Sequence, residues 1–166
     1  IDSGDYYGIA NPEFMGEVER FADWLEEQPD VSVVGSYVGM LKSLNKAENG
    51  NDEAWHKLPE DNLQVIDYLV SYQLVQEIEP HLSPIFDPEY TTVRITAGTS
   101  NLSNVQLLNL NRRIEAWYQE NINPKYRVLH GNNSILYARL DDAISRQLLE
   151  GFMVSFLLIT LTMLVG

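Results

Sequence analysis

The stretch NPEFMGEVERFADWLEEQPDVSVVGSY, residues Asn11 to Tyr37, contains the two kinds of secondary structure on which the predicted fold depends. Its first part predicts an amphipathic helix, because Asn11 is a suitable N-cap and Pro12 costs no hydrogen bond at the first helical position. The apolar positions recur every three or four residues as one stripe: Phe14, Val18, Phe21, Ala22 and Leu25. Pro29 closes the helix, and the β-branched residues 31–34 predict a short strand directly after it.

Two further helices are predicted C-terminal to this strand. YVGMLKSLNKA begins at Tyr37 and carries Val38, Leu41 and Leu44 on one side. A polar loop separates it from NLQVIDYLVSYQLVQEI, which continues the helical signal to about residue 82. The prolines that follow end this helical region, since proline cannot donate a helical hydrogen bond: Pro80, Pro84 and Pro88.

The next part of the chain repeats the strand and helix pattern. YTTVRITAGT, residues 90–99, alternates polar and apolar side chains as a half-buried strand does. Residues 103–121 predict a helix capped by Ser103, and KYRVLHG, residues 125–131, predicts a final strand. No helix breaker occurs between Asn133 and Gly151, so one long helix is expected from there to the end of the chain.

This order of elements predicts an α+β fold in which two βαβ units surround a helical insertion. It is typical of a ferredoxin-like sandwich, with helices on one face of a four-stranded sheet. The expected segments are a first βαβ half (1–36), a helical insertion (37–88), a second βαβ half (89–132) and a juxtamembrane helix that continues into a membrane span (133–166). Only the end of the first strand, near Ile1, is present, so we expect the chain to be a fragment with residues missing upstream.

The C-terminal run GFMVSFLLITLTMLVG, from Gly151 to Gly166, contains no charged residue. A bilayer core of about 30 Å needs roughly 20 apolar residues in a helix, so this run is slightly short. A buried core helix or a C-terminal docking helix is the simpler alternative. However, apolar side chains occupy every direction around the helix and leave no polar face for water. We therefore expect a truncated transmembrane helix that enters the bilayer near Leu148, with membrane contact through residues 148–166.

Composition excludes several classes of function. The 166 residues carry 24 acidic and 11 basic side chains, a formal charge of −13, which argues against nucleic acid as a partner. No cysteine is present, so disulfides, thiolate metal sites and cysteine nucleophiles are excluded. His56, His81 and His130 lie far apart without a metal-binding spacing, and no nucleophile elbow, phosphate loop or dinucleotide fingerprint occurs. We expect neither an enzyme nor a cofactor.

Several motifs resemble those of one transporter family in order and spacing. The chain resembles the periplasmic loop of exporters of the resistance-nodulation-division superfamily, in the hydrophobe/amphiphile efflux-3 branch related to the mycobacterial membrane protein large group. The N-terminal residues that carry the resemblance are Gly8, Pro12, Glu13 and Phe14; Pro29, Val31, Val34 and Ser36; Leu41, Lys42, Leu44, Asn45 and Ala47; Leu58 and Pro59. RVLHGNNSILYARLDDAISRQLLEGFMVS, from Arg127 to Ser155, resembles the family's strand, glycine turn and helix, with His130-Gly131 in place of the commoner Thr-Gly.

The resemblance implies a secondary transporter of the bacterial inner membrane, with residues 1 to about 147 in the periplasm. Such a protein exports hydrophobic or amphiphilic molecules, lipid or drug-like, and is commonly driven by protons. The carboxylates that carry protons in such transporters would lie on spans outside this chain, and the rest of the protein's own chain is an implied partner. A homo-oligomer and the identity of the substrate are left open.

Four aromatic side chains are candidates for lining a substrate route, since aromatic rings hold amphiphiles well: Trp55, Tyr68, Tyr72 and Trp117. Core packing or docking of the insertion is the simpler explanation for them. On the juxtamembrane helix, Arg139 and Arg146 are candidates for meeting lipid phosphates, but pairing with Asp142, three or four residues away, is the alternative we favour.

Two other functions fit the same sequence. The first is a membrane-tethered extracytoplasmic binding or sensor domain with a single span and no transport. The second is a soluble domain whose apolar C-terminal run closes a dimer.

Overall fold

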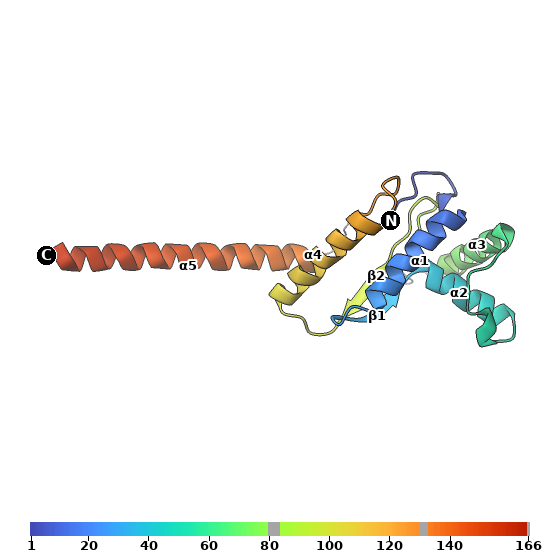
Figure 1. The fold of residues 1–166 in the computed structure, drawn as a ribbon, viewed down its shortest axis with the longest axis horizontal. Coiled ribbons are helices and arrows are strands. Elements are labelled where there is room, and N and C mark those ends of the chain that lie inside the picture. The colour runs from blue at the N-terminus through green and yellow to red at the C-terminus, as the bar shows by residue number, and fades with distance from the viewer. Residues whose placement is uncertain (80–83, 130–132, 166) are drawn as a thin grey trace. The chain divides into compact units, whose positions relative to one another are not determined.

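The chain is mixed α+β, with five α-helices and one two-stranded sheet in the residues that the computed structural model describes, 1–79, 84–129 and 133–165 (Figure 1). It divides into two compact units. The first is Ile1–Ser100 with Ile114–Leu129, and the second is Asn101–Arg113 with His130–Gly166. Helix α4 (Asn104–Asn121) contributes residues to both units.

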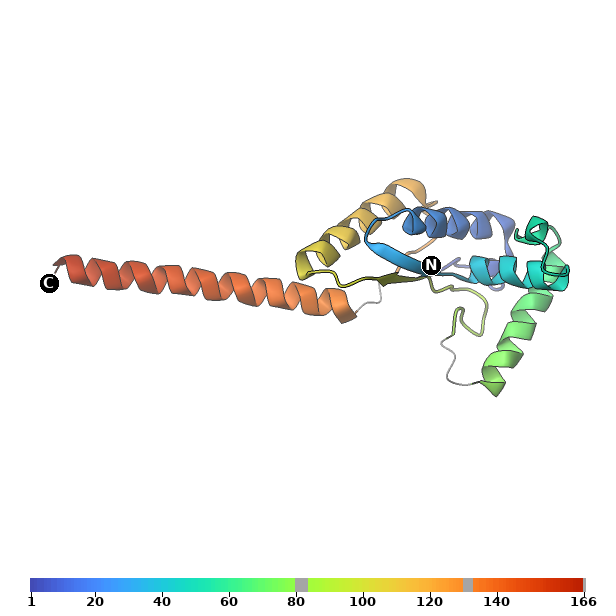
Figure 2. The same ribbon diagram turned by 90° about the horizontal axis from the view of Figure 1, so that it is seen from below.

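Helix α1 (Pro12–Glu26) forms as the sequence predicts. The side chain of Asn11 accepts a hydrogen bond from the Glu13 N–H at 2.8 Å, and Pro12 occupies the first turn. The buried face of the helix is the predicted stripe with Met15 added: Phe14, Met15, Val18, Phe21, Ala22 and Leu25. The helix covers one face of the sheet (Figure 2).

The sheet pairs β1 (Val31–Gly35) with β2 (Thr96–Thr99) in antiparallel register. Val31 lies opposite Thr99 and Gly35 opposite Thr96, with an irregularity between Val31 and Val33. The strand predicted over 90–99 is therefore confirmed only at its C-terminal end.

Residues 1–3 lie between two other segments of the first unit. On one side Ser3 N donates to Thr91 O and Val93 N donates to Ile1 O, each at 2.8 Å. On the other side Asp2 and Arg127 exchange two backbone hydrogen bonds of 2.8 and 3.1 Å. All of these pairings are antiparallel, but each reaches only one or two residues.

The predicted four-stranded ferredoxin-like sheet is not seen among the described residues. Residues 91–94 divide their backbone donors between two neighbours, because Val93 N donates to Ile1 O whereas Arg94 N donates to Ile85 O at 2.6 Å. A continuous ladder with one partner is therefore interrupted before β2 begins. The strand predicted at 125–131 is reduced to the bridge at Arg127 over residues 125–129, and His130 and Gly131 lie outside the described residues.

Gly8 lies in a 3-10 turn, η1 (Gly8–Ala10), beside the paired residues 1–3. A Cβ added there would lie 2.7 Å from the Cβ of Ser3, closer than real Cβ contacts permit. Ser3 is itself fixed, since its hydroxyl donates to Thr91 O at 2.7 Å. Only glycine allows the turn to approach this closely.

The predicted insertion contains α2 (Tyr37–Glu48), the 3-10 turn η2 (Glu53–Trp55) and α3 (Asn62–Ile78). Side chains of Ser36, Asp52 and Asp61 cap these elements by accepting backbone N–H bonds. The buried amide of Asn45 donates to Trp55 O and Lys57 O at 3.1 and 3.0 Å, which fixes the loop between the helices.

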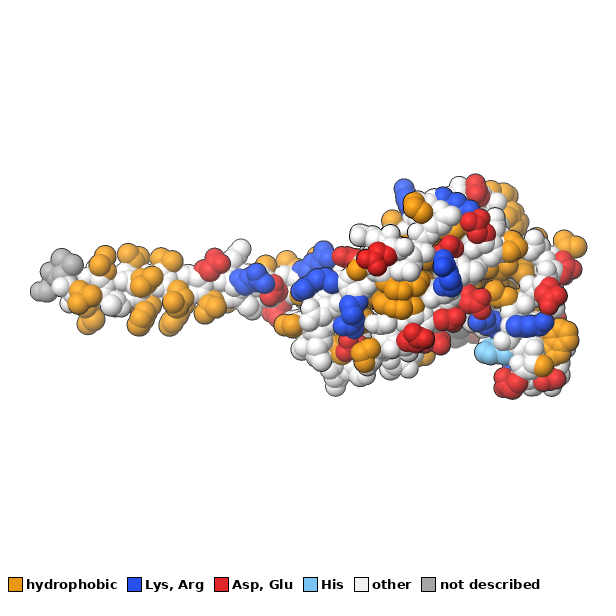
Figure 3. Space-filling view, in the orientation of Figure 1, with side chains coloured by type: hydrophobic (Ala, Val, Ile, Leu, Met, Phe, Trp, Pro, Cys, Tyr) orange, Lys and Arg blue, Asp and Glu red, His pale blue; other side chains and the backbone are white. Residues whose placement is uncertain are grey.

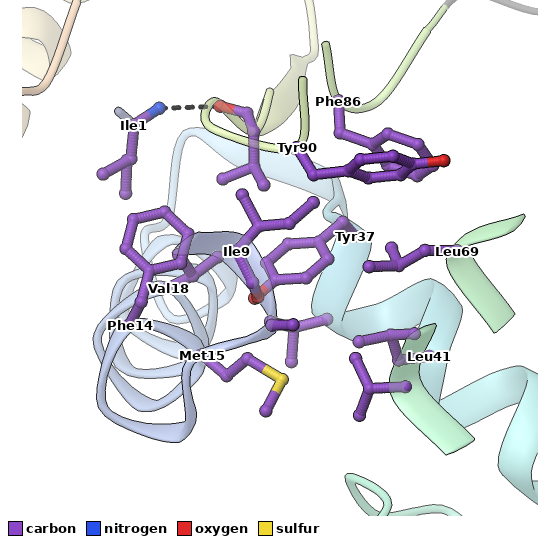
Figure 4. Close-up of a cluster of buried hydrophobic side chains, with 14 of the residues drawn as sticks. Ile1, Ile9, Phe14, Met15, Val18, Tyr37, Leu41, Leu69, Phe86 and Tyr90 are labelled. Carbon is purple, nitrogen blue, oxygen red and sulfur yellow. Dashed lines mark hydrogen bonds between the residues drawn. The ribbon is translucent and has the colours of Figure 1, made fainter. Parts of the chain in front are cut away.

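The core of the first unit is centred on Tyr37, which is fully buried. Its ring lies among Ile9, Leu41 and Leu69, and its hydroxyl donates to Ile9 O at 2.7 Å (Figure 4). Burial raises the pKa of the Tyr37 phenol well above its ordinary value, so the hydroxyl stays a neutral donor. The bond between Ile1 N and Val93 O, drawn as a dashed line, closes one side of this core.

Helix α5 (Asn133–Val165) is the long C-terminal helix that the sequence predicts. By length and composition alone, residues Ile135–Leu164 suffice to cross a membrane. None of the apolar 18-residue stretch within them is buried. Hydrophobic side chains cover its C-terminal half in Figure 3. In its polar half, Arg146 Nε pairs with Asp142 Oδ2 at 3.2 Å, which confirms the predicted pairing of these two residues.

Candidate functional site

Five aromatic rings form a continuous row through the first unit, here called the aromatic row. Tyr6 meets Tyr7 edge to face at 4.7 Å between ring centroids, and Tyr7 stacks on Tyr90 at 4.8 Å. Tyr90 stacks on Phe86 at 5.5 Å, and Phe86 meets Tyr72 of α3 at 5.6 Å. The row thus runs from an exposed ring, Tyr6, through the buried pair Tyr90 and Phe86. Figure 4 shows these two buried rings side by side.

Two residues of the aromatic row have unusual backbone conformations. Tyr7 and Tyr90 both have φ of 56°, in the left-handed region that bulky residues rarely adopt. Each belongs to a tight turn: Gly8 N donates to Asp5 O at 2.9 Å around Tyr7, and Tyr90 N donates to Asp87 O at 3.1 Å. Tyr7 N also donates to Glu89 O at 3.3 Å. Their stacking joins the two turns, so packing offsets a local cost of about 1–3 kcal/mol for each residue.

A pocket of about 490 Å³ lies against the buried end of this row. One wall comes from the C-terminal half of α3, through Gln73, Gln76 and Glu77. The other comes from the proline-flanked segment 84–88, through Pro84, Phe86, Asp87 and Pro88. The size is typical of a small-molecule site, and the surface that the walls expose is almost entirely apolar.

Asp87 anchors the turn in the second wall. Its carboxylate accepts hydrogen bonds from Thr91 N at 2.8 Å, Thr91 Oγ1 at 2.9 Å and Thr92 N at 2.6 Å. Burial alone would raise the pKa of Asp87, but these hydrogen bonds outweigh it and hold the pKa below its ordinary value. The carboxylate is therefore ionised at neutral pH.

The two glutamines of the first wall differ in their partners. Gln73 Oε1 accepts a hydrogen bond from the Tyr90 hydroxyl, and burial raises the pKa of that phenol, so it remains a donor. Gln76 Nε2 is out of contact with solvent and has no hydrogen-bond partner among the residues that the structure describes. A buried donor of this kind costs about 1–3 kcal/mol unless another group satisfies it.

The four aromatic candidates from the sequence do not lie together. Only Tyr72 belongs to the aromatic row, where its ring contacts Phe86 of the pocket wall. Tyr68 is buried between α2 and α3, donating to Glu48 Oε2 at 2.8 Å and accepting from Gln64 Nε2 at 2.7 Å.

The two tryptophan candidates lie on other elements. Trp117 of α4 stacks on Phe21 and Trp24 of α1, at 5.3 and 5.1 Å, and joins the two helices within the first unit. Trp55 is 42% exposed in η2, with Lys57 Nζ 5.5 Å from the centre of its ring. Packing and docking describe Tyr68 and Trp117 better than a shared route does.

The pocket residues were missed because their signals were weak. Gln73, Gln76 and Glu77 lie in a helix whose apolar residues are spread around it, so no stripe sets them apart. The signal that was present is PIFDP, residues 84–88, where two prolines enclose an aromatic ring and an acidic turn residue.

Within the described ranges, no group of three or more His, Asp or Glu side chains is placed to hold a metal ion. His56 follows η2 and is exposed, whereas His81 and His130 lie outside the described residues.

Comparisons with known proteins leave the site to be interpreted from its own geometry. No family model matches the chain, and neither the search of curated proteins nor the search of solved structures found a similar one.

Proposed function

We propose that the chain is part of an inner-membrane secondary transporter of the resistance-nodulation-division type, related to the mycobacterial membrane protein large group. It would export hydrophobic or amphiphilic molecules and be driven by protons. In this proposal the first unit lies in the periplasm, where it handles substrate, and α5 enters the bacterial inner membrane.

Helix α5 is the observation that carries the proposal. It continues without a break from a polar half, with ion pairs such as Arg146–Asp142, into an apolar half whose side chains are exposed. A helix that is apolar on all sides requires an apolar environment. Conformational change in a membrane domain could then reach the extramembrane part through one rigid element.

The order of backbone pairings supports a ferredoxin-like porter subdomain as the finer fold. Arg127 pairs with Asp2, residues 1–3 pair with residues 91–93, and β2 pairs with β1. Neighbouring segments are antiparallel to each other. Numbered by their position in the sequence, the four segments lie side by side in the order fourth, first, third, second. Two βαβ halves with a shared antiparallel sheet would produce this order.

The pocket beside the aromatic row supports the handling of an amphiphile. Its exposed surface is almost entirely apolar, and Phe86 and two prolines in its walls would suit the apolar body of such a molecule.

The experiment that tests this proposal is to sequence the gene on both sides of the region encoding this chain and to count hydrophobic segments. We expect about five further spans after Gly166, followed by a second extramembrane loop with a similar order of elements. A stop codon or a soluble domain directly after the apolar run would contradict transport. That result would favour the alternative, a membrane-tethered binding or sensor domain, which the single candidate span in the described residues also fits.

A further inference from the structure

We infer that α5 pairs in parallel with the α5 helix of a second copy of the chain, through an apolar stripe on its polar half. The stripe, here called the α5 stripe, lies on one side of the helix and consists of Leu136, Tyr137, Leu140, Ile144 and Leu148. The inference rests on one part of the proposed function, the entry of α5 into a membrane. It does not depend on transport.

Every member of the α5 stripe is exposed, from 49% at Leu140 to 69% at Leu148. Helix α4 meets a different side of α5 within the second unit. There Asp141 Oδ2 accepts a hydrogen bond from Asn104 Nδ2 at 2.5 Å, and Ala138, one turn before Asp141, is buried. Contact with α4 therefore leaves the α5 stripe uncovered.

The bilayer does not cover most of the α5 stripe either. Leu136 lies 15 residues before Gly151, about 22 Å along the helix at a rise of about 1.5 Å per residue. Charged residues such as Asp142 and Glu150 occupy the same length of helix, and charges are costly inside hydrocarbon. The stripe from Leu136 to Ile144 thus lies on the water side of the membrane, where an exposed apolar surface of this kind marks a protein interface.

A second copy is the partner that this geometry fits. Two copies inserted in one membrane with the same orientation have parallel α5 helices, so their stripes lie at the same depth. Tyr137, Leu140 and Ile144 follow one another at spacings of three and four, the pattern by which two parallel helices interlock. A two-fold axis between the helices lets each stripe meet an identical one.

The charges beside the α5 stripe also suit this pairing. On a helix of about 3.6 residues per turn, Arg139 lies beyond one edge of the stripe and Asp141 beyond the other. In a parallel two-fold pair, the Arg139 edge of each copy faces the Asp141 edge of the other, so opposite charges meet at nearly the same depth. Asp142 and Arg146 pair with each other on the side away from the stripe, which keeps their charges out of the interface.

Two residues continue the same side of the helix toward the membrane. A Cβ added to Gly151 would meet no neighbouring group within 4 Å, so packing around it among the described residues does not require glycine. Glycine weakens a helix interior, but it lets two helices approach closely in a membrane. The amide of Gln147 has both donors and an acceptor, so it can pair with the Gln147 amide of the second copy.

Cysteine crosslinking tests the pairing, because the chain contains no cysteine of its own. Leu140→Cys and Ile144→Cys place a thiol in the α5 stripe. Leu149→Cys is the matched control, since Leu149 is also an exposed leucine but lies on the opposite side of the helix from Leu140. The full chain is oxidised with copper phenanthroline in the membranes of the bacterial cells that express it. We expect both stripe variants to form disulfide-linked dimers several times faster than Leu149→Cys.

A second pair of variants separates specific packing from chance collision. Both are made in the Leu140→Cys chain, and both add one negative charge at adjacent positions. Ile144→Asp should slow crosslinking about three- to tenfold, because the carboxylate would be buried between the helices. Ser145→Asp, beside the stripe and exposed, should leave the rate nearly unchanged. Alkaline carbonate extraction confirms that every variant is inserted.

Each outcome decides for or against the inference. Equal rates at Leu140, Ile144 and Leu149, equal effects of the two aspartate changes, or no dimer at all would overturn it and assign the α5 stripe to a different partner. The count of membrane spans tests transport separately. A crosslinked dimer without further spans would therefore remove only the proposed transport, and a monomer with further spans would remove only the pairing.

Discussion

Tyr37 links the core of the first unit to the turn before α1, through the bond from its hydroxyl to Ile9 O. Tyr37→Phe removes this bond and leaves a buried carbonyl unsatisfied, so we expect a loss of about 1–2 kcal/mol in the free energy of unfolding at pH 7. Urea denaturation of the full chain in nanodiscs, followed by tryptophan fluorescence, measures it. An unchanged midpoint would show that the bond contributes nothing.

The buried Tyr37 phenol also predicts that the free energy of unfolding depends on pH. Burial raises the pKa of the Tyr37 phenol in the folded chain, whereas in the unfolded chain this pKa is about 10. The stability due to its neutral form is therefore fully present below about pH 10 and declines as the pH rises above that value. We expect the wild-type chain to lose stability faster than Tyr37→Phe above this pH. Parallel curves for the two chains would contradict the assignment.

At the scale of elements, the close approach of η1 to residues 1–3 is the most sensitive junction. Gly8→Ala would push a methyl group into Ser3, which pairs with Thr91. We expect a loss of about 1–3 kcal/mol, measured by the same denaturation. Gly16→Ala is the matched control, since its added Cβ meets no atom within 4 Å and lies inside α1, where alanine should gain about 0.5–1 kcal/mol. Equal effects of the two changes would refute the steric argument.

The apolar half of α5 makes a second prediction at this scale. Leu158→Arg places a charge near the middle of the apolar run, which costs about 3 kcal/mol for membrane insertion. Leu140→Arg makes the same change in the polar half of the same helix and should have little effect. Alkaline carbonate extraction of membranes reports the inserted fraction. If both variants extract alike, α5 does not span the bilayer, and a docking helix becomes the better explanation.

The helices could be predicted from the sequence because their signals are local. Asn11 and Pro12 fix the start of α1, and Ser103 precedes α4, where its hydroxyl and Gln106 Oε1 interact at 2.8 Å. The sheet could not be predicted to the same degree, since the length of a strand depends on distant partners. Residues 90–99 alternate correctly, yet the hydrogen bond of Arg94 to Ile85 diverts them before β2. The pocket could not be predicted because no local sequence signal shows where residues 84–88 lie against α3.

At the scale of the whole molecule, the proposed transport depends on α5 as a rigid connection. Inserting Gly-Gly-Ser after Glu150 in the full transporter should abolish export of an amphiphile without preventing membrane insertion. The same insertion after Gly50, an exposed loop residue, is the control and should leave export nearly unchanged. Uptake of a fluorescent amphiphile into inverted vesicles, whose lumen corresponds to the periplasm, measures both. Unaltered export after the Glu150 insertion would show that α5 transmits no motion.

The antiparallel bridges of residues 1–3 also govern the time at which the first unit can be completed during synthesis. Ile1 pairs with Val93, and Asp2 pairs with Arg127, so residues 1–3 leave the ribosome long before the residues with which they pair. Contacts so distant along the chain are slow to form, because a long loop must close first. Until Arg127 has been translated, residues 1–3 lack one of their two neighbours and stay accessible to chaperones.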